Sequence, residues 1–125
     1  ELKRSLADAK KMGATARALV VINPGNPTGQ SLPQAAIEEI LAFAAAEKLV
    51  VMADEVYQEN VYGDAPRFTS FKTALSALRT RAAAGDAAAA KLAAQAQLIS
   101  FHSTSKGFFG ECGLRGGYFE LQNVA

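Results

Sequence analysis

Short apolar runs alternate with longer stretches of helical periodicity along most of the chain. Four runs have the length and the composition of β-strands, and they cover residues 18–23, 49–54, 97–102 and 117–121. The first two are almost uniformly apolar, which is typical of central parallel strands buried on both faces. The alternation predicts an α/β layer structure.

Helical patterns lie between the predicted strands. A helix is expected to begin near Ser31 and Pro33, with Ser31 or its neighbour as the cap and Pro33 in the first turn. Its apolar stripe would comprise Ile37, Ile40, Leu41 and Ala44. Weaker helical periodicity covers residues 2–12 and 71–81.

An alanine-rich stretch follows at residues 82–96 and is interrupted by Gly85 and Asp86. We interpret it as two helical pieces or as a solvated insertion. Biased composition of this kind is usually a spacer without a function of its own.

Polar clusters directly follow three of the predicted strands. They read NPGNPTG at 23–29, DEVY at 54–57 and STSKG at 103–107. Ligands of open parallel sheets bind outside the carboxyl ends of the strands, so these clusters are expected to converge. Only about a dozen residues precede the fourth strand, which is marginal for a helical crossover and favours an antiparallel strand. Arg115, just before that strand, would then lie at the same edge.

Composition narrows the possible functions. The chain has 125 residues, half of them apolar and 20% charged, which is typical of a globular protein and excludes a disordered one. A net charge of +1 offers no field that would attract nucleic acid or anionic lipid. The single cysteine excludes a disulfide scaffold and a multi-cysteine metal site, and no apolar run approaches the roughly 20 residues that cross a bilayer.

The converging clusters hold an amide, a carboxylate, a phenol, a lysine, hydroxyls and an arginine. Pyridoxal phosphate chemistry calls for such a set. It needs a lysine for the Schiff base, a carboxylate for the pyridinium nitrogen, donors for the ring oxygen, and hydroxyls with an arginine for the phosphate.

Three motifs in order, NPGNPTG at 23–29, ADEVY at 53–57 and STSK at 103–106, resemble those of the fold-type I pyridoxal phosphate enzymes. Within that group the chain is similar to the class I aminotransferases. The finer detail of residues 21–30, 53–62 and 101–118 looks like the alanine aminotransferases. Nearly the whole chain takes part, apart from the alanine-rich stretch.

The resemblance implies roles for two charged residues. Lys106 would form the Schiff base with the cofactor aldehyde and then act as the general base, so it is the predicted catalytic residue. Asp54 would face the protonated ring nitrogen and keep the ring an electron sink. The alternatives are an ordinary surface lysine and an aspartate that caps a helix.

Four further residues are expected to bind the cofactor. By the resemblance, Tyr57 and Asn26 would donate to the ring oxygen, and Asn26 would also approach the substrate carboxylate. Ser103 and Arg115 would hold the phosphate. The alternatives are a core aromatic for Tyr57, a simple turn residue for Asn26 and an exposed rim residue for Arg115.

Other residues attract attention without supporting an assignment. His102 at a strand end is interpreted as structural, and Cys112 with Glu111 has no metal-ligand spacing. Residues 25–29 lack the arrangement of a P-loop. No metal site is predicted.

The implied fold is part of the large domain of a fold-type I transferase, a three-layer α/β/α arrangement with a mostly parallel sheet and one antiparallel strand. Residues 1–125 would be the central portion of that domain, without its N-terminal segment and the small domain. A homodimer is expected of the full-length protein, with amino acids and 2-oxo acids as substrates. Nucleic acid and membranes are not expected partners, and the compartment, cytoplasmic or organellar, is left open.

Several functions agree with these motifs. The first is amino-group transfer between L-alanine and 2-oxoglutarate, and a similar one is transfer between glutamate and glyoxylate. A lyase or synthase that uses the same cofactor is a second class. A sensory module or a fragment that binds nothing is a third, and the isolated residues are expected to be inactive.

Overall fold

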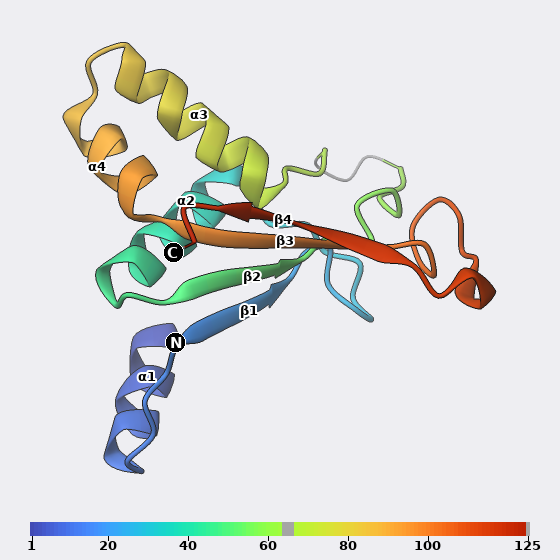
Figure 1. Ribbon diagram of the computed structural model, residues 1–125, viewed down its shortest axis with the longest axis horizontal. Helices are drawn as coiled ribbons and strands as arrows, with labels where there is room; N and C mark the ends of the chain where they lie inside the picture. The colour runs from blue at the N-terminus through green and yellow to red at the C-terminus, as the bar shows by residue number, and fades with distance from the viewer. Residues whose placement is uncertain (64–66, 125) are drawn as a thin grey trace.

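A four-stranded sheet with helices on one side forms the protein (Figure 1). The computed structural model describes residues 1–63 and 67–124. Its elements in chain order are α1 (Leu2–Lys11), β1 (Ala18–Ile22), α2 (Gln34–Ala46), β2 (Val50–Asp54), α3 (Phe71–Ala83), α4 (Ala87–Gln95), β3 (Gln97–Ser103), a 3-10 turn (Cys112–Leu114) and β4 (Gly117–Gln122). All four predicted strands are present, within a residue or two of the expected bounds.

The sheet has the order β1-β2-β3-β4, and its first three strands are parallel. Ile22 pairs with Asp54, which in turn pairs with Phe101, so the three strands end side by side. Strand β4 runs antiparallel to β3, with Gly117 opposite Ser103. The mostly parallel sheet with one antiparallel strand is as predicted, and the start of β4 therefore lies at the same edge as the ends of the other strands.

Helices α2, α3 and α4 cover one face of the sheet (Figure 1). Fully buried side chains of α2 and α3, among them Leu41, Phe71 and Leu75, pack with Val51 and Leu98 of the sheet. Removing these apolar surfaces from water is the main favourable contribution to the fold. This layer holds the strands whose ends carry the candidate site.

The opposite face has no such cover among the described residues. Side chains of successive strand residues point to opposite faces, and Val20 is 63% exposed and Phe119 60% exposed on this side. The sequence predicted strands that are buried on both faces. Within residues 1–63 and 67–124, only the face under the helices is buried. Helix α1, drawn in dark blue at the lower end of Figure 1, has no buried residue.

The alanine-rich stretch forms the end of α3 and all of α4, which bears out two helical pieces. Gly85 makes the turn between them with a φ of +99°, a value that a residue with a Cβ rarely adopts. Asp86 then caps α4, because its Oδ1 accepts a hydrogen bond from the Ala89 amide at 2.9 Å. Small side chains at Ala89 and Ala93 are buried, so the short helix lies close to its neighbours.

The start of α2 differs from the expectation. Pro33, with φ −68° and ψ 152°, is the residue that precedes the helix, and no side chain caps the helix. A capping side chain must stand directly before the first turn to reach its free amides. Ser31 lies two residues too early, and its Oγ has no hydrogen-bond partner among the described residues.

None of the described helices has the length and apolar character needed to cross a membrane.

Candidate active site

The six predicted site residues lie at one edge of the sheet. Asn26 follows β1, Asp54 and Tyr57 lie at and after the end of β2, and Ser103 and Lys106 lie at and after the end of β3. Arg115 precedes β4, whose antiparallel direction brings it to this edge. The topology therefore gathers at one edge residues that are up to 89 positions apart, Asn26 to Arg115.

Asn26 and Tyr57 are in contact. The Asn26 Nδ2 donates to the Tyr57 hydroxyl at 3.4 Å, although the residues are 31 positions apart. Both line a hollow of about 280 Å³ whose wall includes Pro27 and Asn60. Two neutral hydrogen-bonding groups thus stand together at the mouth of a small cavity, where both can donate to an oxygen of a bound molecule.

Asp54 is half-buried at the last position of β2. Its Oδ1 accepts a long hydrogen bond from the Val56 amide at 3.4 Å, and a turn rather than an α-helix follows. The alternative role as a helix cap is therefore wrong. Among residues 1–63 and 67–124 no cation hydrogen-bonds to this partly buried carboxylate, which can therefore accept a positively charged group.

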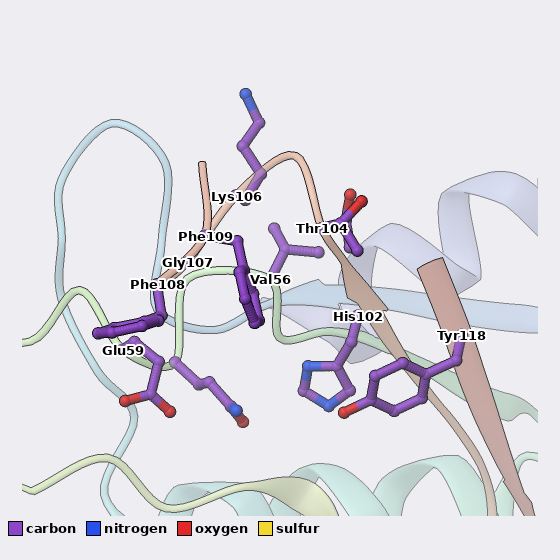
Figure 2. A pocket seen from close by; sticks show the side chains of 11 residues that line it. Val56, Glu59, His102, Thr104, Lys106, Gly107, Phe108, Phe109 and Tyr118 are labelled. Atoms are coloured by element: carbon purple, nitrogen blue, oxygen red, sulfur yellow. The ribbon is translucent and has the colours of Figure 1, made fainter. Parts of the chain in front are cut away.

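Lys106 is exposed in the loop after β3. Figure 2 shows its side chain extending away from a second hollow of about 370 Å³, whose lining includes Val56 and Phe109. Gly107, which follows it, has a φ of +60°, and a Cβ there would stand 3.2 Å from the Val56 carbonyl oxygen. The lysine loop and the turn after β2 therefore approach closely, which only glycine allows without strain.

Hydroxyl and guanidinium groups gather beside the lysine. The Ser103 Oγ accepts a hydrogen bond from the Ser105 amide at 3.1 Å. Arg115, in a left-handed conformation with φ 47°, donates from Nη1 to the Ser105 Oγ at 3.4 Å and to the Cys112 carbonyl at 2.6 Å. Sequence reasoning did not single out Ser105, whose contact with Arg115 depends on the folding of the loop.

Side chains beside these groups have structural contacts. The His102 ring stacks on Tyr118 of β4 with centroids 4.9 Å apart, which agrees with its structural interpretation. The exposed Cys112 is a free thiol. Within residues 1–63 and 67–124 no group of three His, Cys, Asp or Glu side chains is placed to hold a metal ion.

Two buried polar residues at the same edge were given no role by sequence reasoning. Asn23 and Glu55 are 0% and 1% exposed, at the ends of β1 and β2. Burial raises the pKa of Glu55, an effect that the hydrogen bond from the Phe71 amide and the nearby Ser100 hydroxyl partly offset. The signal that could have indicated their burial was a polar residue directly after an apolar strand. At that position a polar residue is usually interpreted as part of an exposed loop.

The donor set fits pyridoxal phosphate. Lys106 supplies a primary amine, Asp54 a carboxylate, and the Asn26–Tyr57 pair two donors to an oxygen. Ser103 and Arg115 are of the types that hold a phosphate through hydroxyl and forked guanidinium hydrogen bonds. These groups lie around one sheet edge, with Asn26 and Tyr57 beside one hollow and Ser103 and Lys106 beside the other.

Known aminotransferases are similar to this chain in sequence. The family model described as "Aminotransferase class I and II" matches residues 1–123. Glutamate–glyoxylate aminotransferase 2 of Arabidopsis thaliana is 50% identical over 123 residues, which are 98% of this chain and 24% of that protein. Alanine aminotransferase 1 of Bos taurus is 48% identical over 124 residues, 99% of this chain and 23% of that protein. The chain spans about a quarter of the length of these relatives.

Solved aminotransferase structures share the fold. An aminotransferase from Escherichia coli matches with a TM-score of 0.63 and 28% identity, over 94% of this chain and 24% of that one. The alanine aminotransferase from Pyrococcus furiosus matches with a TM-score of 0.63 and 25% identity, over 93% and 25% of the two chains. Since the family model matches all but the last two residues, this chain belongs to the class I and II aminotransferases.

Proposed function

We propose that these residues are the central portion of the large, cofactor-binding domain of a longer transaminase that moves an amino group from L-alanine to 2-oxoglutarate. The observation that carries this proposal is the gathering of Lys106, Asp54 and the Asn26–Tyr57 pair at one edge of the sheet. The similarity to alanine aminotransferases supports the choice of substrates. The full-length protein would act as a homodimer.

Class I and II aminotransferases in general depend on pyridoxal phosphate, and each predicted residue has a part in holding it. Lys106 would carry the cofactor as a Schiff base on Nζ, and Asp54 would face the ring nitrogen. Ser103 and Arg115 would hold the phosphate. When bound, the cofactor supplies an electron sink for the pair released when the Cα–H bond of the substrate breaks.

Two groups would act on the substrate directly. The Lys106 Nζ would act as the general base that takes the Cα proton of the substrate. Asn26, which already faces Tyr57, would donate to the ring oxygen or to the substrate carboxylate. The exposed position of Lys106 in the described part of the chain leaves it free to move between these tasks.

The assignment of Lys106 can be tested with the complete protein. After incubation with pyridoxal phosphate, borohydride reduction should fix the cofactor on the peptide that contains Lys106. The matched control is Lys91→Ala, which removes an exposed lysine of α4 and should leave the labelled peptide unchanged. A label on another lysine, or no label, would contradict the proposal.

A second transamination is favoured by a specific observation, since relatives at 49–50% identity are named glutamate–glyoxylate aminotransferases. Parallel assays would compare pyruvate formation from alanine and 2-oxoglutarate with glycine formation from glutamate and glyoxylate. Faster pyruvate formation supports the first pair. Formation of neither product would point to another reaction of the same cofactor, or to a protein without catalysis.

A further inference from the structure

Two buried polar side chains stand directly after parallel strands, and a third lies within the neighbouring strand β3. Asn23, directly after β1, is 0% exposed, Glu55, directly after β2, is 1% exposed, and Ser100, in β3, is 2% exposed. None belongs to the predicted cofactor contacts. A buried polar group costs free energy unless it is hydrogen-bonded, so the partners of these side chains show what they do.

Asn23 and Glu55 bind the same short segment at the start of α3. The Asn23 Nδ2 donates to the Thr69 carbonyl at 3.2 Å, and its Oδ1 accepts from the Leu32 amide at 2.9 Å. The Glu55 Oε1 accepts from the Phe71 amide at 2.8 Å. The segment 69–71 therefore joins the loop after β1 to the turn after β2.

The segment is itself held in place. Phe71 is fully buried, and the Ser70 Oγ caps α3 by accepting a hydrogen bond from the Thr73 amide at 3.0 Å. Glu55 also reaches the third strand, because its own amide donates to the Phe101 carbonyl at 3.3 Å. The turn that carries Asp54 and Tyr57 is thus tied both to α3 and to the strand that leads to Lys106.

The second carboxyl oxygen of Glu55 is free to make a further hydrogen bond. Neither Glu55 Oε2 nor Ser100 Oγ has a hydrogen-bond partner among the described residues, and the Ser100 hydroxyl lies near enough to influence the carboxyl. A protonated Glu55, or a glutamine in its place, would offer a donor on that side and keep an acceptor for Phe71.

We propose that Glu55 and Asn23 are positioning residues that, through segment 69–71, hold Asn26 and Tyr57 in register around the cofactor ring oxygen. This inference rests on the proposed function above. The two loops meet at the Asn26–Tyr57 hydrogen bond of 3.4 Å, and their bases are joined by the β1–β2 ladder and by the Asn23 amide, which donates to the Asp54 carbonyl at 3.0 Å. Beyond these paired strand ends, the buried side chains of Asn23 and Glu55 give the loops a second connection through segment 69–71.

The experiment uses the complete protein with added pyridoxal phosphate. Glu55→Leu removes the acceptor of the Phe71 amide, and Asn23→Asp, which is nearly isosteric, places an acceptor against the Thr69 carbonyl. Each should weaken cofactor binding about tenfold, since a buried group is left unpaired. Each should also change the visible circular dichroism per bound cofactor, which reports how the ring is held. Glu55→Gln keeps the acceptor for the Phe71 amide, so its cofactor affinity and its circular dichroism should stay within about threefold of the wild-type values.

The control variant Leu78→Ala distinguishes a positioning role from a general loss of stability. Leu78 is a buried residue further along α3. This control should lower the melting temperature and leave cofactor affinity and circular dichroism unchanged. The double variant Glu55→Leu/Asn23→Asp should lose less affinity than the product of the single effects, because both act through one segment.

The outcomes separate the two proposals. If wild-type protein binds no cofactor at Lys106, the proposed function fails and this inference with it. If it binds, wild-type affinity and circular dichroism in Asn23→Asp, or equal changes in Leu78→Ala, would overturn the positioning role alone. Asn23→Asp decides the matter even where Glu55→Leu does not fold.

Discussion

The helix-covered face of the sheet and its carboxyl edge are built on opposite principles. Under the helices, Leu41, Leu75 and Leu98 are fully buried in an apolar layer. At the edge, Lys106 and Asn26 are exposed and the side-chain contacts are polar. The apolar layer stabilises the fold and the edge carries the proposed site, so substitutions in the two regions should separate stability from activity.

The largest expected effect belongs to the edge. In the complete protein Lys106→Ala should lower transamination at least about a thousandfold, because both the covalent link and the proton carrier are lost. Unfolding free energy should change by less than about 0.5 kcal/mol, since the side chain is exposed. Enzyme assays and urea unfolding measure the two quantities, with Lys91→Ala as the control. Substantial residual activity would remove Lys106 from the catalytic role.

The apolar layer should respond in the opposite way. Leu41→Ala is expected to cost about 3 kcal/mol of unfolding free energy through lost burial and the cavity left behind. Cofactor affinity per folded molecule should stay unchanged, because Leu41 lies on α2 in the apolar layer and not at the carboxyl edge. The control is Glu39→Ala on the exposed side of the same helix. A loss below about 1 kcal/mol would show that the layer repacks around the gap.

The cap of α4 allows a smaller test of the alanine-rich stretch. Asp86→Ala removes the acceptor for the Ala89 amide and should cost about 1 kcal/mol of unfolding free energy. Asp86→Asn keeps a capping oxygen and is the matched control. Thermal unfolding of both variants measures the difference. Equal melting temperatures for wild type and Asp86→Ala would mean that tertiary contacts, among them the Asn123 hydrogen bond to the Ala93 carbonyl, hold α4 without the cap.

The smallest expected effect is the contribution of Glu55, at the edge, to the pH dependence of the unfolding free energy. Burial raises the pKa of Glu55 in the folded state, so its contribution is fully present below the unfolded pKa and is lost as pH rises through the folded pKa. Relative to wild type, Glu55→Gln should therefore gain stability as pH rises through that window and stay ahead above it. Unfolding free energies across a pH series measure the difference.

Glu38 provides a control of opposite sign. Burial alone would raise its pKa, but hydrogen bonds from Gln34 and Arg81 and the charge of Arg81 lower it overall. Its contribution is present above the unfolded pKa and is lost as pH falls through the folded pKa. Glu38→Gln should be less stable than wild type near neutrality and equal to it in acid. The same slope in both variants would contradict the assigned environments.

Sequence patterns predicted the elements well where periodicity was strong. The strands ending at Ile22 and Asp54 were readable because both are nearly uniform apolar runs, but β1 is the edge strand of the sheet and its Val20 and Ile22 are exposed among the described residues. The short connection before Gly117 correctly indicated an antiparallel strand. The predicted cap at Ser31 was wrong, because α2 begins only after Pro33 and Ser31 is then too far from the first turn to cap it.

The sequence by itself determined which strand ends carry polar groups, and hence that Lys106, Asp54 and Arg115 share an edge. That follows from local rules, since strand direction and connection length suffice. The tertiary structure decided how that edge is held. The contacts of Asn23 with Thr69 and of Glu55 with Phe71 join residues 46 and 16 positions apart. Such contacts depend on how α3 packs against the sheet, which is a property of the whole fold and is absent from any local pattern.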